Sequence, residues 1–278
     1  MAALLYLVPT PIGNLSDISD RCRQTLAEAD FIAAEDTRVT RKLLNHLQLH
    51  KPLVSYHEHN KGAAGPEIIA RIAQGQTCAL VTDAGSPAIS DPGEDLVRLA
   101  AQAQIPVCAI PGPCAAITAL SISALPTGRF AFEGFLPAQK KQRQARLDQL
   151  RTEPRTMIFY EAPHRLLATL GQLLACFGPD RPISLCRELT KLHEEVLRFD
   201  LASALAYFQG NAPRGEFVLV VGGAPEARQD APDLATGVTL VRQLMASGLS
   251  RKEAARQAAA QTGLAKNQLY AASMEAAD

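Results

Sequence analysis

Three turns rich in glycine and proline carry the residues of this sequence that are best suited to hold a small ligand. They are residues 9–14, 83–93 and 110–116, and each directly follows a short apolar run. Gly85 and Gly112 allow a ligand to approach bare backbone, and the neighbouring prolines stiffen the loops. Because proline also removes backbone N–H donors, these turns suit a ligand without phosphate groups.

The familiar phosphate-binding patterns do not occur after the first apolar run. Neither G-x-G-x-x-G nor the P-loop pattern is present, which argues against a dinucleotide-binding dehydrogenase and a P-loop NTPase. Asp83 could instead accept hydrogen bonds from ribose hydroxyls or neutralise an ammonium group. One such turn usually only joins a strand to a helix, whereas three at one edge favour a binding site.

Short apolar runs alternate with helical patterns over residues 1–125. The apolar runs are 4–10, 31–34, 52–56, 78–83 and 107–111, and the helical segments include 22–29, 66–73, 93–103 and 114–124. Continuous apolar strands separated by helices predict a parallel sheet that is covered on both faces. The carboxyl ends of its strands meet at one edge, where ligands bind in such folds.

The rest of the chain divides into two further parts. Residues 126–224 are predicted to form a second, mixed α+β domain, with strands at 130–136, 156–161, 183–187, 196–200 and 216–221. Residues 225–278 are predicted to be a linker followed by a helical tail. Ser250 and Glu253 have the spacing of a capping box, and residues 249–270 resemble a helix-turn-helix.

Composition restricts the function classes. The 278 residues are 47% hydrophobic and 20% charged, with a formal net charge of zero, so nucleic-acid binding would have to rest on local patches. No apolar run approaches the ~20 residues that span a bilayer, and the N-terminus lacks the features of a signal peptide. The six cysteines form no C-x-x-C pair. We expect a cytoplasmic protein that has reduced thiols and does not associate with membranes.

A metal site is not expected. His57, Glu58 and His59 supply possible ligands, but adjacent positions of a strand point to opposite faces, and no third ligand lies nearby in the sequence.

Several blocks together resemble the tetrapyrrole methylases, which are class III S-adenosylmethionine-dependent methyltransferases. The blocks are residues 7–18, 34–38, 81–93 and 110–116. Four more, at 132–137, 159–165, 186–195 and 213–216, are similar to the bacterial members that methylate the ribose 2′-hydroxyl of a cytidine in small-subunit (16S) ribosomal RNA. The resemblance covers essentially the whole chain. It implies a two-domain α/β fold with an all-helical C-terminal appendix, S-adenosylmethionine as cofactor, 16S rRNA in the small ribosomal subunit as partner, and a homodimer.

The resemblance also implies a cofactor site in a cleft between the two domains. The residues at the matching positions are Pro9, Asp83, Ala84, Gly85, Ser86, Ile89, Cys114, Ala115, Tyr160, Glu161 and Gly215. Cys114 stands where the family often has Ser or Thr, and a thiol is a weaker hydrogen-bond donor than a hydroxyl. We therefore expect the turn before Cys114 to hold the cofactor mainly through backbone groups.

Methyl transfer to a hydroxyl requires alignment of the acceptor and removal of its proton. The candidate bases or orienting residues are Asp36, Glu188 and Lys191, with Glu35, Glu161 and His193 behind them. Asp36 could equally cap a helix, and Glu188 with Lys191 could be a structural ion pair. The residue pattern does not single out one base.

Basic residues gather in two local clusters despite the zero net charge. The candidate RNA-binding residues are Arg38, Arg41 and Lys42 in one cluster, and Lys140, Lys141, Arg143 and Arg146 in the other. Such runs are often solvated helix faces, but they also suit contact with phosphates. The tail has a similar local charge from Arg251, Lys252, Arg256 and Lys266, and it either binds nucleic acid or packs as a helical hairpin.

Two other functions stay open at this point. A methyltransferase acting on a tetrapyrrole, such as a sirohaem or cobalamin precursor, would share the fold and would need a wide cleft between the domains. A DNA-binding regulator would use the C-terminal helices to bind a duplex and would catalyse no turnover.

Overall fold

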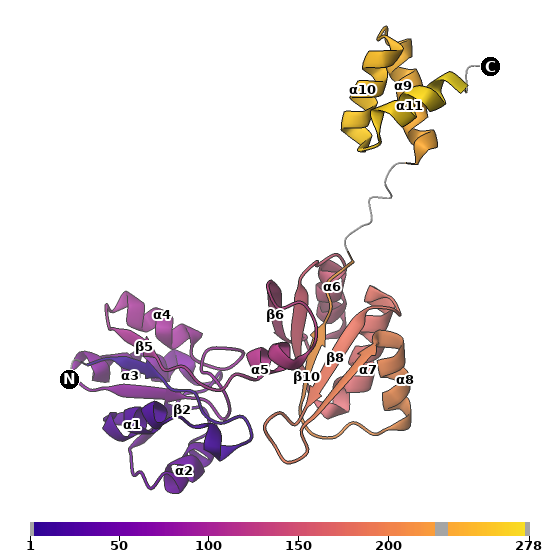
Figure 1. The fold of residues 1–278 in the computed structure, drawn as a ribbon. Coiled ribbons are helices and arrows are strands. Elements are labelled where there is room, and N and C mark those ends of the chain that lie inside the picture. The colour runs from indigo at the N-terminus through magenta and orange to yellow at the C-terminus, as the bar shows by residue number, and fades with distance from the viewer. Residues whose placement is uncertain (1–2, 226–232, 276–278) are drawn as a thin grey trace. The chain divides into compact units, whose positions relative to one another are not determined.

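The computed structural model describes residues 3–225 and 233–275. The chain forms two compact units, Met1–Ala224 and Pro225–Asp278 (Figure 1). Apart from Pro225, the linker predicted at 225–232 lies outside the described residues.

The first sheet consists of five parallel strands in the order β3-β2-β4-β1-β5. Their bounds are β1 Leu5–Leu7, β2 Phe31–Ala34, β3 Leu53–Ser55, β4 Cys78–Val81 and β5 Val107–Ala109. The helices between them are α1 Asp20–Glu28, α2 Thr37–His46, α3 Lys61–Ala73 and α4 Glu94–Gln102, and a 3-10 helix, η1, spans Leu15–Asp17. The parallel sheet predicted from the apolar runs is confirmed.

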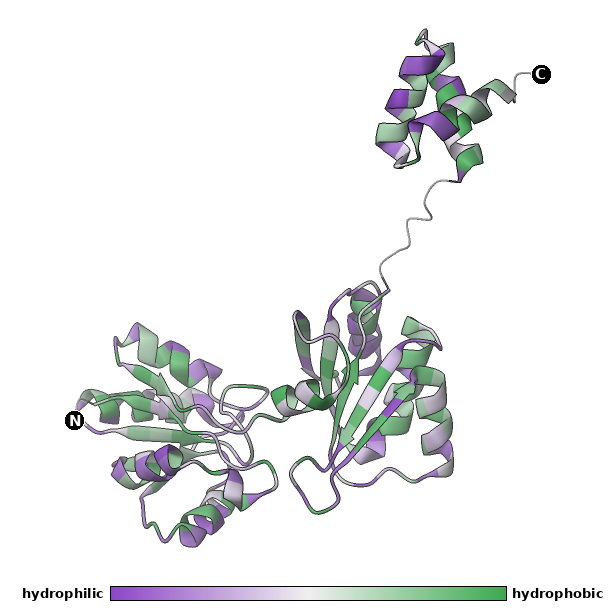
Figure 2. Ribbon diagram, in the orientation of Figure 1, coloured by the Kyte–Doolittle hydropathy of each residue, from purple (hydrophilic) through white to green (hydrophobic). Residues whose placement is uncertain are grey.

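Both faces of this sheet are buried, as β2 illustrates. Its alternate residues Ile32 and Ala34 pack in the core that includes Leu26 of α1 and Leu44 of α2. Phe31 and Ala33 point the other way, into the core formed with α3 and α4. All four side chains of β2 are fully buried, which explains why the strand is apolar at every position (Figure 2).

One helix begins earlier than its sequence predicts. The helical segment expected at 66–73 is part of α3, which begins at Lys61 and holds Pro66 inside it. Proline at this position removes the hydrogen bond to the carbonyl of Gly62. Gly62 is exposed in the first turn of the helix, where water can take the place of the missing donor.

The second sheet is mixed, in the order β6-β7-β10-β8-β9. Its strands are β6 Phe130–Phe135, β7 Thr156–Glu161, β8 Pro182–Arg187, β9 Glu195–Asp200 and β10 Phe217–Val221. Only the β6–β7 pair is parallel among these neighbours. Three helices cover one face through a shared core: α6 Lys140–Leu150, α7 Pro163–Phe177 and α8 Leu201–Gly210. The predicted mixed α+β fold of this part is confirmed.

Helix α5, Ala115–Ile122, covers the opposite face of the second sheet. Its buried residues Ala116, Ala119 and Leu120 share a core with Ile158 of β7 and Val218 of β10. The helix follows directly after the turn that leaves the first sheet. It therefore brings a ligand-facing turn of one sheet against the strands of the other.

In the described part of the C-terminal unit, three helices share a core of their own: α9 Leu234–Ala246, α10 Arg251–Thr262 and α11 Lys266–Glu275. The capping interaction predicted at the start of α10 is present, since Ser250 Oγ accepts a hydrogen bond from the Glu253 N–H at 3.3 Å. Gly263 ends α10 in the left-handed conformation, with φ +73°. Across residues 3–225 and 233–275, no helix is long and apolar enough to cross a membrane.

Candidate active site

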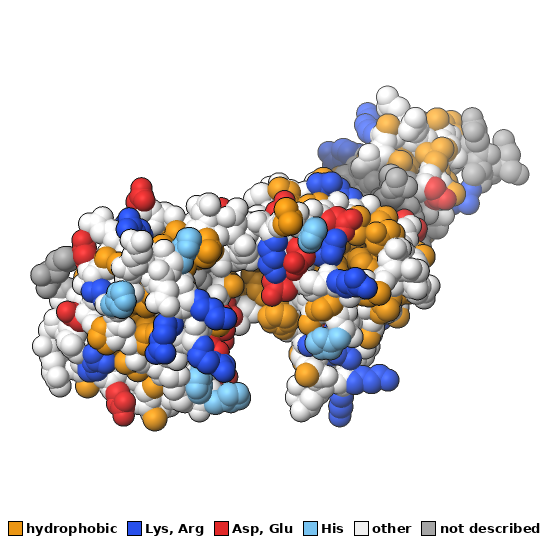
Figure 3. Space-filling view, turned by 90° about the horizontal axis from the view of Figure 1, so that it is seen from below, with side chains coloured by type: hydrophobic (Ala, Val, Ile, Leu, Met, Phe, Trp, Pro, Cys, Tyr) orange, Lys and Arg blue, Asp and Glu red, His pale blue; other side chains and the backbone are white. Residues whose placement is uncertain are grey.

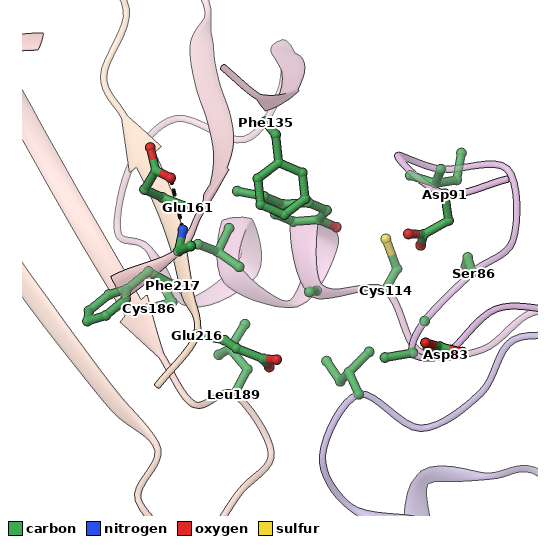
Figure 4. A pocket seen from close by; sticks show the side chains of 18 of the residues that line it. Asp83, Ser86, Asp91, Cys114, Phe135, Glu161, Cys186, Leu189, Glu216 and Phe217 are labelled. Atoms are coloured by element: carbon green, nitrogen blue, oxygen red, sulfur yellow. Dashed lines mark hydrogen bonds between the residues drawn. The ribbon is translucent and has the colours of Figure 1, made fainter. Parts of the chain in front are cut away.

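A cavity of about 500 Å³ lies within the unit Met1–Ala224 and is lined from both sheets (Figure 4). This size is within the range of ~300–1,000 Å³ that is usual for small-molecule sites. The loops after β1, β2, β4 and β5 supply one wall, including Ile12, Glu35 and residues 83–86. The strands and loops of the second sheet supply the other wall, including Tyr160 and residues 216–218.

The three turns singled out in the sequence are hydrogen-bonded to one another at this wall. The N–H of Thr10 donates to the carbonyl of Gly85 at 2.9 Å, and the N–H of Gly85 donates back to Thr10 at 3.0 Å. Ser86 Oγ donates to the carbonyl of Pro113 at 2.9 Å. The edge of the sheet therefore presents a single connected surface.

Most residues assigned to the cofactor by resemblance line this cavity. They are Asp83, Ala84, Gly85, Ser86, Ile89, Cys114, Ala115, Tyr160 and Glu161. Pro9 and Gly215 are not among the lining residues. Pro9 packs behind the wall, where a Cβ placed on Gly112 would lie 2.4 Å from Pro9 Cγ. Gly215 makes room for Glu188, whose side chain would lie 2.6 Å from a Cβ at that position.

Gly85 has a conformational reason to be glycine. Its φ is +86°, a conformation that side-chain-bearing residues rarely adopt. An added Cβ would find Ile12 Cγ2 at 3.4 Å, which is an ordinary contact. Backbone strain, rather than crowding, is therefore what a side chain at this position would introduce.

The wall from the second sheet is held by Tyr160 and Glu161 of β7. The Tyr160 hydroxyl accepts a hydrogen bond from the N–H of Ala116 at 3.2 Å, which ties β7 to the start of α5. Burial raises the pKa of Tyr160, so it stays a neutral phenol. The Glu161 carboxylate accepts from Ala162 N–H at 2.9 Å and from Thr169 Oγ1 at 2.5 Å. Because its oxygens are bonded within the fold, Glu161 offers a ligand mainly its backbone.

Three carboxylates make the opposite wall acidic. Burial is the main cause that raises the pKa of both Glu35 and Asp83. Burial, together with the charges of Glu35 and Asp83, raises the pKa of Asp91 to about 6. Such a wall favours a ligand that carries positive charge. Asp91 was not among the site residues predicted from the sequence. Only its position in the loop 83–93 could have indicated it.

The predicted catalytic residue Asp36 does not line the cavity. It caps α2, where its Oδ1 accepts the N–H of Arg38 at 2.8 Å, and it pairs with the Arg38 guanidinium at 2.6 Å. Hydrogen bonds from Arg38 lower the pKa of Asp36 to about 2. Its own N–H donates to Asp83 Oδ1 at 3.1 Å, so Asp36 touches the wall only through its backbone.

Glu188 and Lys191 form an ion pair at 2.9 Å and lie outside the lining. Lys191 Nζ also bonds the carboxylate of Glu216 at 2.9 Å, and Glu216 is a lining residue. Glu188 accepts the N–H of Glu216 at 2.9 Å, and its hydrogen bond from Lys191 lowers its pKa. The pair holds the segment that leads into β10.

The predicted RNA-binding residues lie on two helices. Arg41 and Lys42 are exposed on α2, and Figure 3 looks onto the face covered by α1 and α2, where Lys and Arg side chains gather. Lys140 and Lys141 are exposed at the start of α6, while Arg146 pairs with Glu133 at 2.7 Å. Arg143 is half-buried, and its Nε has no hydrogen-bond partner among the described residues. Over the same residues, no group of three or more His, Cys, Asp or Glu side chains is placed to hold a metal ion.

Comparison with known proteins shows to which protein family the chain belongs. Residues 4–205 match the Tetrapyrrole (Corrin/Porphyrin) Methylases, and the chain belongs to this family. It is therefore an S-adenosylmethionine-dependent methyltransferase. Residues 231–277 match the RsmI C-terminal HTH domain.

Two relatives that match over nearly their full length carry the same, more specific name. The chain is 50% identical to "Ribosomal RNA small subunit methyltransferase I" of a Synechocystis species, over 98% of both chains. It is 45% identical to the protein of the same name from Escherichia coli O157:H7, over 98% of this chain and 94% of the relative.

Among solved structures, uroporphyrin-III-C-methyltransferase from Thermus thermophilus aligns with a TM-score of 0.56 at 21% identity, over 80% of this chain and 95% of that chain. The cobalamin biosynthetic enzyme cobalt precorrin-4 methyltransferase aligns with a TM-score of 0.59 at 15% identity, over 80% and 95%. These similarities establish the fold that was predicted.

Proposed function

We propose that this chain methylates small-subunit (16S) ribosomal RNA at the ribose 2′-hydroxyl of a cytidine. The observation that carries the proposal is the similarity of 45–50% identity, over nearly the whole chain, to proteins named as small-subunit rRNA methyltransferases. Because the similarity spans both the catalytic unit and the C-terminal helices, it favours a common substrate as well as a common reaction.

The cavity suits S-adenosylmethionine chemically. The cofactor carries a positive sulfonium and an ammonium group, and the carboxylates of Glu35 and Asp83 in the acidic wall can stabilise both. When bound, it supplies a methyl group made electrophilic by the charge on sulfur. We propose that the eleven residues named from the family resemblance hold it, with Pro9 and Gly215 acting from behind the lining residues.

We propose that Asp36, Glu188 and Lys191 position other groups for the reaction. The backbone N–H of Asp36 orients the Asp83 carboxylate, and Lys191 with Glu188 orients Glu216. Both oriented residues line the cavity. These contacts support a role in alignment, which is the main demand of a displacement at a sulfonium carbon.

The RNA would bind through the basic residues of α2 and α6. Arg41, Lys42, Lys140 and Lys141 are exposed and can reach phosphates, and Arg38, Arg143 and Arg146 lie beside them in sequence. A ribosomal substrate implies a cytoplasmic protein. In this proposal, residues 1–125 and 126–224 build the catalytic cleft, and the helices after 225 extend the contact with RNA.

A homodimer is also proposed. Exposed apolar side chains on an edge strand and on the helix that follows it in the chain support it: Val107 of β5 is 37% exposed and Ile117 of α5 is 48% exposed. Sedimentation of the wild type and of Ile117→Glu would test it. A dimer in the wild type that dissociates in the variant is the expected result, whereas a wild-type monomer would contradict the proposal.

The substrate is tested by incubating the protein with labelled S-adenosylmethionine and, in separate reactions, small ribosomal subunits, naked rRNA and a porphyrinogen. Label in the small subunit or its rRNA, with nuclease products that carry a 2′-O-methylcytidine, is expected. Label only in the porphyrinogen would replace the proposal with tetrapyrrole methylation. No transfer to any acceptor, combined with tight binding of duplex DNA, would favour a regulator.

A further inference from the structure

Asp91 enters the cavity from the loop that follows β4, on the same side as Ser86 and Cys114 (Figure 4). It lies near the carboxylates of Glu35 and Asp83, which both contribute to its electrostatic environment. Its side chain is half-buried. Neither the sequence patterns nor the family resemblance assigned it a role.

The backbone around Asp91 adopts conformations that side-chain-bearing residues rarely take. Ala88 has φ +67° and Ser90 has φ +68°, and Gly93 follows with φ +146°. Two strained non-glycine residues this close together persist only where the surrounding structure holds them, and such strain concentrates at functional sites.

The second sheet holds this loop from the other side. Gly134 of β6 lies at a register shift in the β6–β7 pairing, with φ +59°. A Cβ on Gly134 would lie 3.1 Å from Ser90 Oγ, so glycine allows Ser90 to approach the strand closely. Ser90 therefore lies against β6, and Asp91, the next residue in the chain, lines the cavity.

The Asp91 carboxylate is left without a partner. Within the described part of the chain it forms no hydrogen bond or ion pair, and its environment consists of burial and the negative charges of Glu35 and Asp83. The other carboxylates of the acidic wall each accept a backbone hydrogen bond: Asp83 accepts the N–H of Asp36 at 3.1 Å, and Glu35 accepts the N–H of Asp83 at 3.5 Å. Glu216 is paired with Lys191, the Tyr160 hydroxyl bonds the backbone of Ala116, and Glu161 is bonded within the fold.

We propose that Asp91 is the catalytic base of methyl transfer. This proposal rests on the proposed function in one respect, namely that the methyl acceptor is a hydroxyl. As the hydroxyl oxygen bonds to the methyl carbon, the carbon–sulfur bond breaks and its electron pair goes to sulfur. The sulfonium becomes a neutral thioether, and the hydroxyl proton passes to the Asp91 carboxylate and then to water. A half-buried, unpartnered carboxylate is suited to this task, because nothing in the fold competes for its lone pairs.

The test compares Asp91→Asn, Asp91→Glu and the wild type in single-turnover transfer at saturating S-adenosylmethionine. The acceptor is the small subunit or the naked rRNA, whichever takes up label in the experiment above. Label only in the porphyrinogen would remove the hydroxyl acceptor and contradict the proposed function, whereas a failure of the base proposal alone leaves transfer to rRNA unchanged in Asp91→Asn. Asp91→Asn should lower the rate at least ~100-fold, and Asp91→Glu should restore part of it. Calorimetry should give cofactor affinities within about threefold of the wild type for both variants. Asp180→Asn, an exposed turn residue, is the matched control and should behave as the wild type.

The pH profile separates a base from a residue that only shapes the cavity. The wild-type rate should rise with pH and level off above the pKa of Asp91 at about 6, and this rise should be absent from the residual rate of Asp91→Asn. A wild-type rate in Asp91→Asn would overturn the proposal. So would a variant that loses only cofactor affinity and reaches the full rate at saturation, since Asp91 would then bind the cofactor's cationic groups.

Discussion

At the scale of single residues, Gly112 shows how a turn depends on the absence of one side chain. A Cβ at this position would lie 2.4 Å from Pro9 Cγ, and the proline ring cannot rotate away. Either the turn after β5 or the turn after β1 would have to shift. Because the Ser86–Pro113 hydrogen bond crosses this region, a shift would reach the cavity wall.

We therefore expect Gly112→Ala to weaken S-adenosylmethionine binding at least ~tenfold, equivalent to about 1.4 kcal/mol. The free energy of unfolding should fall by about 1–3 kcal/mol, as for other overpacked sites. Calorimetry and urea denaturation measure the two effects.

Gly171→Ala is the matched control, since its Cβ would meet nothing within 4 Å. In α7 it should add about 0.5–1 kcal/mol of stability and leave affinity unchanged. Unchanged affinity in Gly112→Ala would contradict the placement of the site.

Asp91 also links the cavity to the pH dependence of stability. Its pKa rises from an ordinary 3.8 to about 6 on folding, so the folded protein binds more protons than the unfolded chain between these values. The free energy of unfolding therefore falls as pH rises through this window, and the penalty is complete above it. Asp91→Asn should melt at a higher temperature than the wild type at about pH 8, with a smaller difference near about pH 4. A lower melting temperature at the higher pH would show that the charged form is not disfavoured.

The residue types of the site could be predicted only in part. Gly85 and Asp83 stand out because they directly follow an apolar strand. Asp91 does not, since the side chain that enters the cavity is decided by the φ angles of Ala88 and Ser90, which no local pattern encodes. For Asp36, Glu188 and Lys191 the sequence left two interpretations open. The cap and the ion pair are present in the structure, and a part in catalysis stays a proposal.

At the scale of secondary structure, burial on both faces made the first sheet predictable. In a chain of alternating strands and helices, strands that are apolar at every position are typical of a parallel sheet that helices cover on both faces. Helix α5 was different. Its apolar residues surround the helix, and Ile117 remains 48% exposed, so periodicity could not indicate that α5 packs on the second sheet. The start of α3 was missed for a local reason, because proline is normally a sign of a boundary.

Helix α6 offers a test of RNA binding at this scale. Lys140→Gln with Lys141→Gln removes two exposed charges that have no partner within the described residues. We expect a weaker affinity for small subunits and a salt dependence whose slope falls by about 0.7–0.9 for each lost phosphate contact. Cofactor affinity should not change. Filter binding over a salt series measures the slope. Arg98→Gln on α4, which covers the other face of the first sheet, provides an exposed control. Equal slopes for the double variant and the wild type would mean that α6 only faces solvent.

At the scale of the whole molecule, the cavity belongs to one unit, and the other unit has a hydrophobic core of its own. All residues that line the cavity lie between Ile12 and Val218. The C-terminal helices have their own core around Val241, Ala255 and Leu269. Their exposed residues include Arg256, Lys266 and Asn267, which can contact phosphates or base edges. The division predicts that cofactor binding and substrate binding can be separated.

A protein that ends at Ala224 should bind S-adenosylmethionine within about twofold of the full chain, because its cavity and both sheets are intact. Its kcat/KM for small ribosomal subunits should fall at least ~tenfold. The change should appear in KM rather than kcat if the C-terminal helices contribute equal binding energy to the ground state and the transition state. Lys252→Gln with Arg256→Gln in the full chain should give a smaller loss in the same direction. Equal kcat/KM in the shortened protein would show that these helices do not contact the substrate, and lost cofactor binding would show that the cavity depends on them.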